Sequence, residues 1–577
     1  MHFARAGGQG LALMVAFAAI SNAVADDGSA VPILHDTVVV DAASPAPDGV
    51  GRHETTEQAS VVMSAVDRIP PPVAPLSPRC QCNVTGAGVD WSKYPETIRQ
   101  MPRPGIFSIP PTGCGYYSAL DALTDRCRPA QPPSGYAPFA INAWPFFDAD
   151  WRYVENVRDN QRTIVERLKR IRATDRLLLS TGGEFWLRYS NETNSRLTGT
   201  ENDYLLSHVR QYLDVWYGDN LRVYGEYVWA DSFGEELAPV PPDVDRGDIL
   251  DLFVDVRLGD LAGKPVYLRG GRQELLFGSQ RLVTPLPWAN KRHSFDGFRL
   301  FRKGETFDFD AFWTHYVPPQ ASEFDSADDN QTFAGLWATQ RPQKGESRDL
   351  YYLFYDNENA AMPLGIRRAP FQTHTFGSRW AGSRDGFLWD AEAALQSGHQ
   401  ADRDLFAGMG TIGLGKHWSE ALWSPSFWLY YDYASGDNDP TSGTSNTFNQ
   451  QFPFGHYYLG WMDLVGRQNI HDLNAHLYLY PTKWTTVWLQ YHHFYLAEER
   501  DALYNAGGVP YRRDPTGAAG NNVGDEIDLV LNFHLTRYSD LLVSYNKLFG
   551  GSFLEATAGP GQASDAETLY LIFQQRW

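Results

Sequence analysis

Beyond its N-terminus the 577-residue chain has no run of about 18 apolar residues, the length that a transmembrane helix requires. Transmembrane helices are therefore excluded, and the mean hydropathy is low at -0.39. Positive charge is also scarce, because 49 Lys and Arg face 69 Asp and Glu and leave a net charge of -20. Nucleic acid is excluded as a partner, since phosphate binding requires a basic surface.

Lysine is particularly rare, with only nine Lys among the 49 basic residues. Arginine binds carboxylates through two parallel hydrogen bonds and stays charged when it is removed from water. The bias fits arginines placed in a confined polar interior. A GC-rich genome would raise the arginine content without a functional reason, so both explanations remain open.

The motifs of common enzyme classes are absent: there is no P-loop, no G-x-S-x-G and no H-E-x-x-H. His492 and His493 are neighbours on a predicted strand and face opposite sides, which argues against joint metal ligation. Asp437, Asn438 and Asp439 form an acidic turn without the downstream Glu of an EF-hand, so a solvated turn is favoured over a calcium site. We expect no enzymatic activity, no cofactor and no metal.

The first 25 residues have the layout of a secretory signal peptide. Arg5 precedes the apolar stretch 11–20, and Ala23-Val24-Ala25 provides an A-x-A cleavage site before Asp26. We therefore expect an exported protein.

The cysteines number only four, and all of them lie in one segment of the exported chain. Their spacing matches no zinc pattern and no His lies among them, so two local disulfides are favoured over a metal site. The disulfide candidates are Cys80, Cys82, Cys114 and Cys127.

Aromatic residues, in contrast, are abundant: they make up 14% of the chain and include 18 Trp and 30 Tyr. Trp and Tyr settle where lipid meets water, so this content is typical of a protein with two membrane interfaces. The alternative is a secreted carbohydrate-binding β-protein.

The chain divides by its patterning into four parts. After the signal peptide (1–25), residues 26–150 are Pro-rich and lack periodicity, as expected of an extension with disulfides. Residues 151–176 are a linker with a predicted short helix at 159–172. From 177 to 577 apolar and polar residues alternate with period two, which predicts strands of an antiparallel barrel.

The polar face of these strands decides the class of barrel. In residues 249–259, Leu252, Val254 and Val256 oppose Asp251 and Asp255. A wall with lipid on one side and a water-filled lumen on the other explains such a pattern, and it predicts an all-β outer-membrane barrel. We count eighteen strands: 177–190, 204–217, 221–231, 249–259, 265–277, 295–303, 307–317, 331–339, 349–355, 373–382, 386–397, 405–417, 425–435, 471–480, 484–495, 526–536, 539–549 and 567–577.

The connections support an even strand count, because short turns alternate with longer segments, as in bacterial barrels. Residues 456–464 are a nineteenth candidate strand. They would make the count odd, so we assign them to a loop. The last strand, LYLIFQQRW, ends in Trp577 and resembles the terminal signal that barrel-insertion machinery reads. A TonB-dependent receptor is disfavoured because such barrels need about 22 strands.

Two long stretches resemble the alginate export family of outer-membrane barrels, of the AlgE type. They are GRQELLFGSQRLVTPLPWANKRHSFDGFRLF (271–301), and YDYASGDNDP with TFNQQFPFGHYYLGWMDLVGRQNIHDL (431–473). The matching positions are Arg272, Glu274, Gly278, Arg281, Trp288, Asn290, Arg292, Phe295, Asp296 and Gly297, then Tyr431, Asp432, Ser435, Gly436, Asp437, Phe448, His456, Gly460, Asp463 and Asn469. The resemblance spans residues 150–577, whereas the cysteine segment 80–127 departs from it and could be a plug or a periplasmic docking module.

The resemblance implies an 18-stranded channel of the outer membrane, embedded in its lipid, that passes an anionic uronate polysaccharide and has periplasmic scaffold proteins as partners. Guanidinium groups would attract the carboxylates of the polymer, and interleaved acids would prevent binding too tight for release. The basic candidates are Arg188, Arg210, Arg222, Arg257, Arg272, Arg281, Arg292 and Arg299, and the acidic ones are Glu184, Asp214, Glu226, Asp251, Asp255 and Glu274. These groups could instead form salt bridges that stiffen the wall, and a diffusive porin for small sugar acids is the alternative function.

Overall fold

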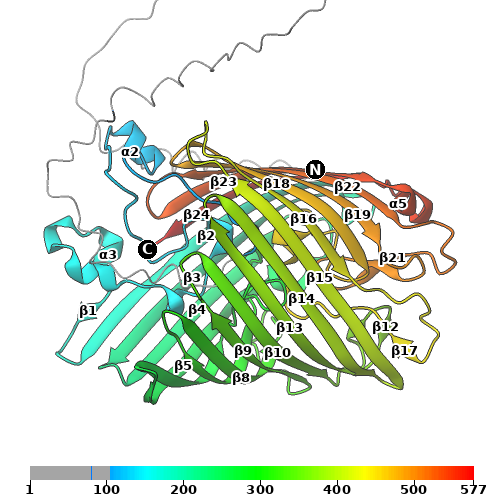
Figure 1. Cartoon of the computed structure of the whole chain (residues 1–577), viewed down its shortest axis with the longest axis horizontal. Helices are drawn as coiled ribbons and strands as arrows, with labels where there is room; N and C mark the ends of the chain where they lie inside the picture. The colour runs from blue at the N-terminus through cyan, green and yellow to red at the C-terminus, as the bar shows by residue number, and fades with distance from the viewer. Residues whose placement is uncertain (1–79, 81–103) are drawn as a thin grey trace, which may run out of the picture. The chain divides into compact units, whose positions relative to one another are not determined.

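The computed structural model describes Cys80 and residues 104–577, so the predicted signal peptide and Cys82 lie outside the described residues. In the described part, one sheet contains 20 strands, of which β1 (Ile171–Arg172) and β17 (Thr444–Ser445) are two-residue additions. The other eighteen are antiparallel neighbours and form a closed barrel (Figure 1). Closure is direct, because β2 pairs with β3 on one side and with β24 on the other.

The eighteen barrel strands are long and follow one another around the wall. They are β2 (Leu177–Ser195), β3 (Thr200–Tyr217), β4 (Leu221–Phe233), β5 (Asp245–Leu261), β6 (Lys264–Gln273), β7 (Ser294–Arg302), β8 (Phe307–Val317), β9 (Gln331–Gln340), β10 (Glu346–Asn357), β13 (Phe371–Arg384), β14 (Phe387–Gln400), β15 (Arg403–His417), β16 (Ser426–Ala434), β18 (Ile470–Thr482), β19 (Thr485–Leu496), β22 (Asn522–His534), β23 (Ser539–Gly550) and β24 (Ala566–Arg576). Each of them overlaps one of the eighteen predicted strands, so the predicted fold class is confirmed.

The alternation of side chains places the two faces of the wall as predicted. Leu213 and Val223 are exposed on the outside, whereas their neighbours Tyr212 and Tyr224 are buried inside. Because successive side chains of a strand point to opposite sides, every strand contributes to both an apolar exterior and an inner face. His492 and His493 obey the same rule, since His492 is buried and His493 is partly exposed on the opposite face.

The two ends of the barrel differ in their connections. The end that carries both β2 Leu177 and the last strand's Arg576 has short turns, which we call the short-turn end: 218–220, 262–263, 303–306, 341–345, 385–386, 418–425, 483–484 and 535–538. The opposite long-loop end has the connections 196–199, 234–244, 274–293, 318–330, 358–370, 401–402, 435–469, 497–521 and 551–565. Residues 456–464 fall in one of these loops, as predicted, and begin in the single-turn helix α4 (Gly455–Tyr458).

Short elements decorate the loops and the N-terminal segment. The remaining ones are α2 (Ala119–Leu123), α3 (Ile164–Arg167), α5 (Ser552–Thr557), the 3-10 turns η3 (Ala140–Asn142), η4 (Phe146–Asp148), η5 (Arg152–Asn156), η6 (Asp159–Gln161) and η7 (Pro241–Asp243), and the pairs β11 (Pro363–Leu364) with β12 (Arg367–Arg368) and β20 (Ala502–Tyr504) with β21 (Pro510–Arg513). In the described part of the chain, none of the helices has the length and apolar character needed to cross a bilayer.

The predicted helix at 159–172 is wrong in its length. Only η6 and the four-residue α3 form there, the latter opened by a capping box in which Thr163 and Glu166 bond reciprocally. Arg170 has a φ of 51°, which no helix accommodates, and Ile171 pairs with Leu179 of β2. Pairing of Ile171 and Arg172 with the first residues of β2 therefore ends the helix after one turn.

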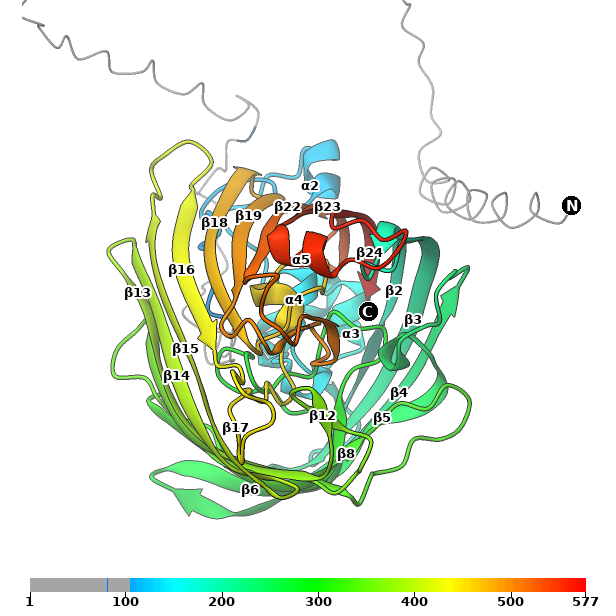
Figure 2. The ribbon, with the colours of Figure 1, turned by 90° about the vertical axis from the view of Figure 1, so that its right-hand side faces the viewer.

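The hydrophobic core lies inside the barrel, where a water-filled lumen was expected. Trp428, Trp461 and Trp488 are among the largest fully buried side chains, together with Tyr457 and Tyr458 of α4. Figure 2 shows α4 within the ring of strands. Loops and the N-terminal segment thus fill much of the space that the strands enclose.

Candidate functional site

The inner wall of β2, β3 and β4 carries a buried ion-pair cluster. The Arg210 guanidinium lies 3.1 Å from Glu184 Oε1 and 2.6 Å from Glu226 Oε1. The pairing register brings these side chains together, since Glu184 lies opposite Arg210 in the ladder of β2 and β3. Because Glu274 Oε2 lies 3.8 Å away as well, one arginine faces three carboxylates.

A second cluster follows on β3, β4, β5 and β6. Arg222 Nε lies 2.7 Å from Asp214 Oδ1, and Arg269 Nε lies 2.7 Å from Asp255 Oδ1. Cation and anion alternate here from strand to strand along one level of the wall. Hydrogen bonds between oppositely charged groups are short, and removal of one partner from such a buried pair would leave an uncompensated charge.

The loop 274–293 turns into the barrel and carries Arg281 to the far wall. Its guanidinium lies 2.8 Å from Asp390 Oδ2 and 2.9 Å from Glu392 Oε2, both on β14. Asp390 also receives a hydrogen bond of 2.7 Å from Arg379 Nε on β13. Two arginines from different parts of the chain therefore share one carboxylate inside the lumen.

The loop 435–469 turns inward beside the first loop, and the two bond to each other. The backbone N–H of Phe452 donates to Leu282 O at 3.1 Å, and the N–H of Phe454 donates to Gln280 O at 3.0 Å. On the wall side, Arg467 Nη1 lies 2.5 Å from Asp432 Oδ1 of β16. Together the loops 274–293 and 435–469 make a constriction across the lumen.

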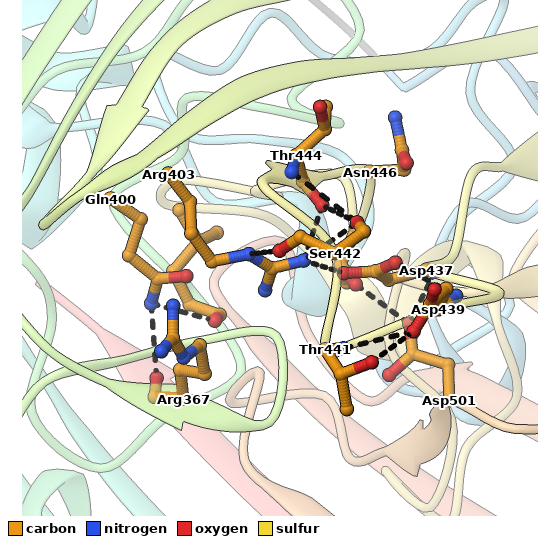
Figure 3. Close-up of polar contacts among 12 residues, drawn as sticks. Arg367, Gln400, Arg403, Asp437, Asp439, Thr441, Ser442, Thr444, Asn446 and Asp501 are labelled. Carbon is orange, nitrogen blue, oxygen red and sulfur yellow. Dashed lines mark hydrogen bonds and ion pairs between the residues drawn. The ribbon is translucent and has the colours of Figure 1, made fainter.

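Figure 3 shows how the base of the loop 435–469 is held. Arg403 of β15 donates to Asp437 Oδ2 at 2.8 Å and to the carbonyl oxygen of Ser442 at 2.8 Å. The backbone N–H of Asp437 in turn donates to Asp501 Oδ2 at 2.8 Å. The acidic turn that begins at Asp437 is therefore partly buried and tied to an arginine, whereas a solvated turn was expected.

The N-terminal segment 104–157 enters the barrel from the short-turn end, and the inner wall bonds to its backbone. Arg222 Nη2 donates to Phe147 O at 2.7 Å, and Arg292 Nη2 donates to Ala143 O at 2.9 Å. On the other side, Trp428 Nε1 donates to Phe107 O at 2.8 Å, and Arg576 Nη1 donates to Ala137 O at 2.8 Å. We call residues 104–157 the luminal segment, since strands from several sides of the wall contact it.

Aromatic stacking adds to these hydrogen bonds. The Arg210 guanidinium lies 4.3 Å above the ring of Phe146, and that of Arg269 lies 4.4 Å above the ring of Phe147. Phe147 also packs edge-on against Phe253, with ring centroids 5.1 Å apart. The luminal segment therefore covers arginines that would otherwise face the open lumen.

Cysteines tie the start of the luminal segment together. Cys80 and Cys127 form a disulfide, and Cys114 is disulfide-bonded as well. The candidate Cys82 lies outside the described residues.

The structure places most of the other predicted residues on the inner face, with different surroundings, but Arg272 is an exception. Arg292 pairs with Glu274, and Arg299 Nη2 lies 2.6 Å from Asp310. Asp251 Oδ1 accepts the backbone N–H of Glu274 at 2.9 Å. Arg257 at the short-turn end is more accessible, 2.7 Å from Asp260. The prediction that Arg272 lines the pore is wrong: Arg272 lies opposite the exposed Leu252 in the ladder of β5 and β6, so it is on the outer face, 2.8 Å from Asp296. A role in transport stays a prediction for the residues of the inner face.

Arg188 is the exception among the candidates. No carboxylate forms an ion pair with its buried guanidinium among the described residues, and this group instead lies 4.5 Å above the ring of Trp288. Arginines have five N–H donors, so incomplete pairing leaves capacity for an anion. Buried N–H groups without a hydrogen-bond partner in the described chain also remain on further luminal arginines: Arg210, Arg269, Arg281, Arg467 and Arg576.

Sequence reasoning missed several residues of this interior. Arg379, Asp390 and Glu392 lie within predicted strands, and their alternation would have assigned them to the inner face. Nothing in the sequence indicates that they meet Arg281 from a loop about 110 residues away. Arg467, Arg269 and Arg576 were likewise not singled out.

One acidic group in the described part has the composition of a metal site. The carboxylates of Asp245, Asp248 and Asp325 converge within 4.8 Å of one another. The ammonium group of Lys291 lies among them, 2.7 Å from Asp325 Oδ2 and in contact with Asp245. A lysine thus takes the place that a cation would occupy.

The chain is similar to several known proteins. Similar solved structures include OccK8 (OprE) of Pseudomonas aeruginosa, with 10% identity, a TM-score of 0.47 and coverage of 69% of this chain and 98% of that chain. OpdK of Pseudomonas aeruginosa with vanillate has 11% identity, a TM-score of 0.45 and coverage of 69% and 98%. No curated protein matches the sequence. Residues 177–566, more than half of the 577 residues, match the profile described as alginate export, and the chain therefore belongs to the alginate export family of outer-membrane barrels.

Proposed function

We propose that this protein exports an anionic, uronate-type polysaccharide across the outer membrane through its arginine-rich lumen. In such barrels the end with the short turns and both termini faces the periplasm, so the polymer would enter there and leave between the long loops. An N-terminal signal peptide would direct the chain to this membrane, with periplasmic scaffold proteins as partners.

The incompletely paired arginines carry the proposal. Arg188 lacks a carboxylate partner in the described structure, and Arg210 and Arg281 each retain a buried N–H group without an acceptor. A polymer with one carboxylate per sugar offers the planar acceptors that these donors bind best. Carboxylates such as Glu184 and Asp390 compete for the same guanidinium groups, which keeps each contact weak enough for the polymer to move on.

The luminal segment acts as a plug in this proposal. Its contacts with β3, β4 and β6 on one side and with β16 on the other leave the arginines covered at the short-turn end. Most of the hydrogen bonds use backbone carbonyl oxygens of the segment, which water can replace when the segment moves. Transport therefore requires that the luminal segment withdraws or shifts.

Planar-bilayer recording of the full-length protein tests the proposal. In the double variant Phe146→Ala/Phe147→Ala, two buried rings that anchor the luminal segment are lost, at a cost of about 3–5 kcal/mol each. We expect a small current for the unchanged protein and a larger, anion-selective current for the variant. The control is Phe324→Ala in the loop 318–330, whose ring is exposed and should not alter the current.

The cargo is identified by comparing how strongly polymeric and monomeric uronic acids block the current. Polyuronate should block the variant's current at a sugar concentration at least about 100-fold below that of the monomeric uronic acid, because several carboxylates bind together. Equal potency of polymer and monomer would instead identify a diffusive porin for small sugar acids. Absence of any current from both proteins would exclude a channel.

A further inference from the structure

The linker between the luminal segment and the barrel is basic, although the whole chain has a net charge of -20. Residues 151–176 contain eight basic and four acidic side chains. The basic ones are Arg152, Arg158, Arg162, Arg167, Lys169, Arg170, Arg172 and Arg176. Such a local excess of positive charge in an acidic protein indicates an anionic partner.

The fold gathers part of this charge around one pocket of about 490 Å³. Its lining combines one acid and one apolar residue, Glu155 and Ile171, with five basic residues: Arg162, Arg167, Lys169, Arg170 and Arg172. The basic residues come from α3, from β1 and from the turns beside them, so the local fold is needed to bring them together.

The one acid that lines the pocket, Glu155, does not neutralise it. Glu155 forms ion pairs with two arginines, at 2.7 Å from Arg170 and 3.8 Å from Arg172. Arg167 is exposed at the end of α3 and forms no ion pair among the described residues. Positive charge therefore remains available to a ligand.

Lys169 connects this pocket with the lumen. Its Nζ donates to the hydroxyl of Tyr212 on β3 at 2.7 Å and to the carbonyl oxygen of Thr181 on β2 at 2.6 Å. Both acceptors belong to barrel strands at the short-turn end. In Figure 1, α3 and β1 lie at the same end of the barrel as the C-terminus.

We propose that Arg167, Arg170 and Arg172 form a capture site that binds carboxylates of the uronate polymer beside the periplasmic entrance. This inference rests on the proposed function and names the place where the cargo first binds. A polymer is the favoured ligand because the arginines lie on separate elements around one pocket, so that successive carboxylates meet successive guanidinium groups. An anion with a single charge would engage only part of this set.

Calorimetric titration of the detergent-solubilised full chain with an oligouronate of uniform length tests the site. The triple variant Arg167→Gln/Arg170→Gln/Arg172→Gln should bind at least about tenfold more weakly, because three guanidinium groups that would pair with carboxylates of the polymer are removed. The luminal arginines are unchanged in this variant.

The matched control removes equal charge from the same end of the barrel. Lys264→Gln/Arg348→Gln/Arg384→Gln alters three accessible side chains, each of which contacts an acid at a short turn. Its affinity for the oligouronate should stay within about twofold of the unchanged protein. Equal losses in both triple variants would reduce the effect to general charge and overturn the capture site.

Two further outcomes separate the alternatives. If the first triple variant loses binding to vesicles of anionic phospholipid but binds the oligouronate as before, the pocket is a lipid headgroup site and the proposal is wrong. If polyuronate still blocks the current of the Phe146→Ala/Phe147→Ala channel while the triple variant binds normally, only the capture site fails. If neither blockade nor binding occurs, the proposed export function fails with it.

Discussion

The backbone N–H of Gly105 donates a hydrogen bond of 2.6 Å to the hydroxyl of Tyr458, across 353 positions of the sequence. The same hydroxyl donates to the carbonyl oxygen of Ser279 at 2.5 Å. Gly105 lies among the first residues of the luminal segment, which we call its tip. The hydroxyl of Tyr458 thereby joins this tip to both loops of the constriction. The plug and the constriction form a single hydrogen-bonded unit in the middle of the barrel.

Removal of that phenolic oxygen should loosen the plug. In Tyr458→Phe the buried N–H of Gly105 loses its acceptor, which costs about 1–3 kcal/mol. We expect more frequent openings in planar bilayers than for the unchanged protein. Tyr431→Phe is the control, because its hydroxyl bonds to His471 at 2.6 Å on the exposed side of the wall. Similar opening rates in the two variants would contradict the role of Tyr458.

Gly105 itself is needed because the wall approaches it closely. A Cβ added at this position would lie 1.7 Å from Asp390 Oδ2. Asp390 cannot easily move, since Arg281 and Arg379 both hold it. Gly105→Ala should therefore displace the tip, at a cost of about 1–3 kcal/mol, and raise the conductance.

The control for this change lies in an open loop. A Cβ at Gly443 meets no atom within 4 Å, so Gly443→Ala should leave the conductance unaltered. Gly105→Ala with the conductance of the unchanged protein would show that the tip does not limit the current.

Arg281 should stabilise the folded barrel as well as attract anions. Arg281→Gln leaves Glu392 without its arginine and Asp390 with one partner fewer, and a broken buried pair costs about 3–5 kcal/mol. Urea unfolding in detergent micelles measures the loss. Arg367→Gln, whose partner Asp402 is largely exposed, should change stability by less than about 0.5 kcal/mol. A small effect at Arg281 would indicate that water already screens this pair.

Lys169 should make stability depend on pH in the alkaline range. Burial lowers the pKa of its ammonium group to about 7, whereas the unfolded chain retains the ordinary pKa near 10.5. Between these values the unfolded state binds the additional proton, so stability rises with pH by about 1.4 kcal/mol per unit. Below pH 7 both states are protonated, and this contribution is constant.

The variant Lys169→Met has no titratable group at this position. Urea midpoints measured between about pH 7.5 and 9.5 should rise more steeply for the unchanged protein than for the variant. Lys344→Met, an exposed lysine of the turn 341–345, should keep the slope of the unchanged protein. Parallel slopes for all three proteins would show that Lys169 titrates normally.

Much of the wall was predictable because a strand has a fixed period. Glu184, Trp186 and Arg188 share one side of β2 for the geometric reason that residues two apart point the same way. The same rule was available for Arg379 and Asp390, which were nevertheless not singled out. The helix predicted at 159–172 failed because its pattern gave no sign that Ile171 would pair with β2.

The alternation along residues 177–577 specified the number of strands, the side that is apolar and the charge on the inner face, since these depend only on neighbours within each strand. Everything inside the barrel was decided by the tertiary structure. The bond from Gly105 to Tyr458 and the sharing of Asp390 by Arg281 and Arg379 join segments that no local pattern relates. Closure of the barrel creates an enclosed volume, and only packing within that volume determines which arginines are covered and which keep unpaired N–H groups.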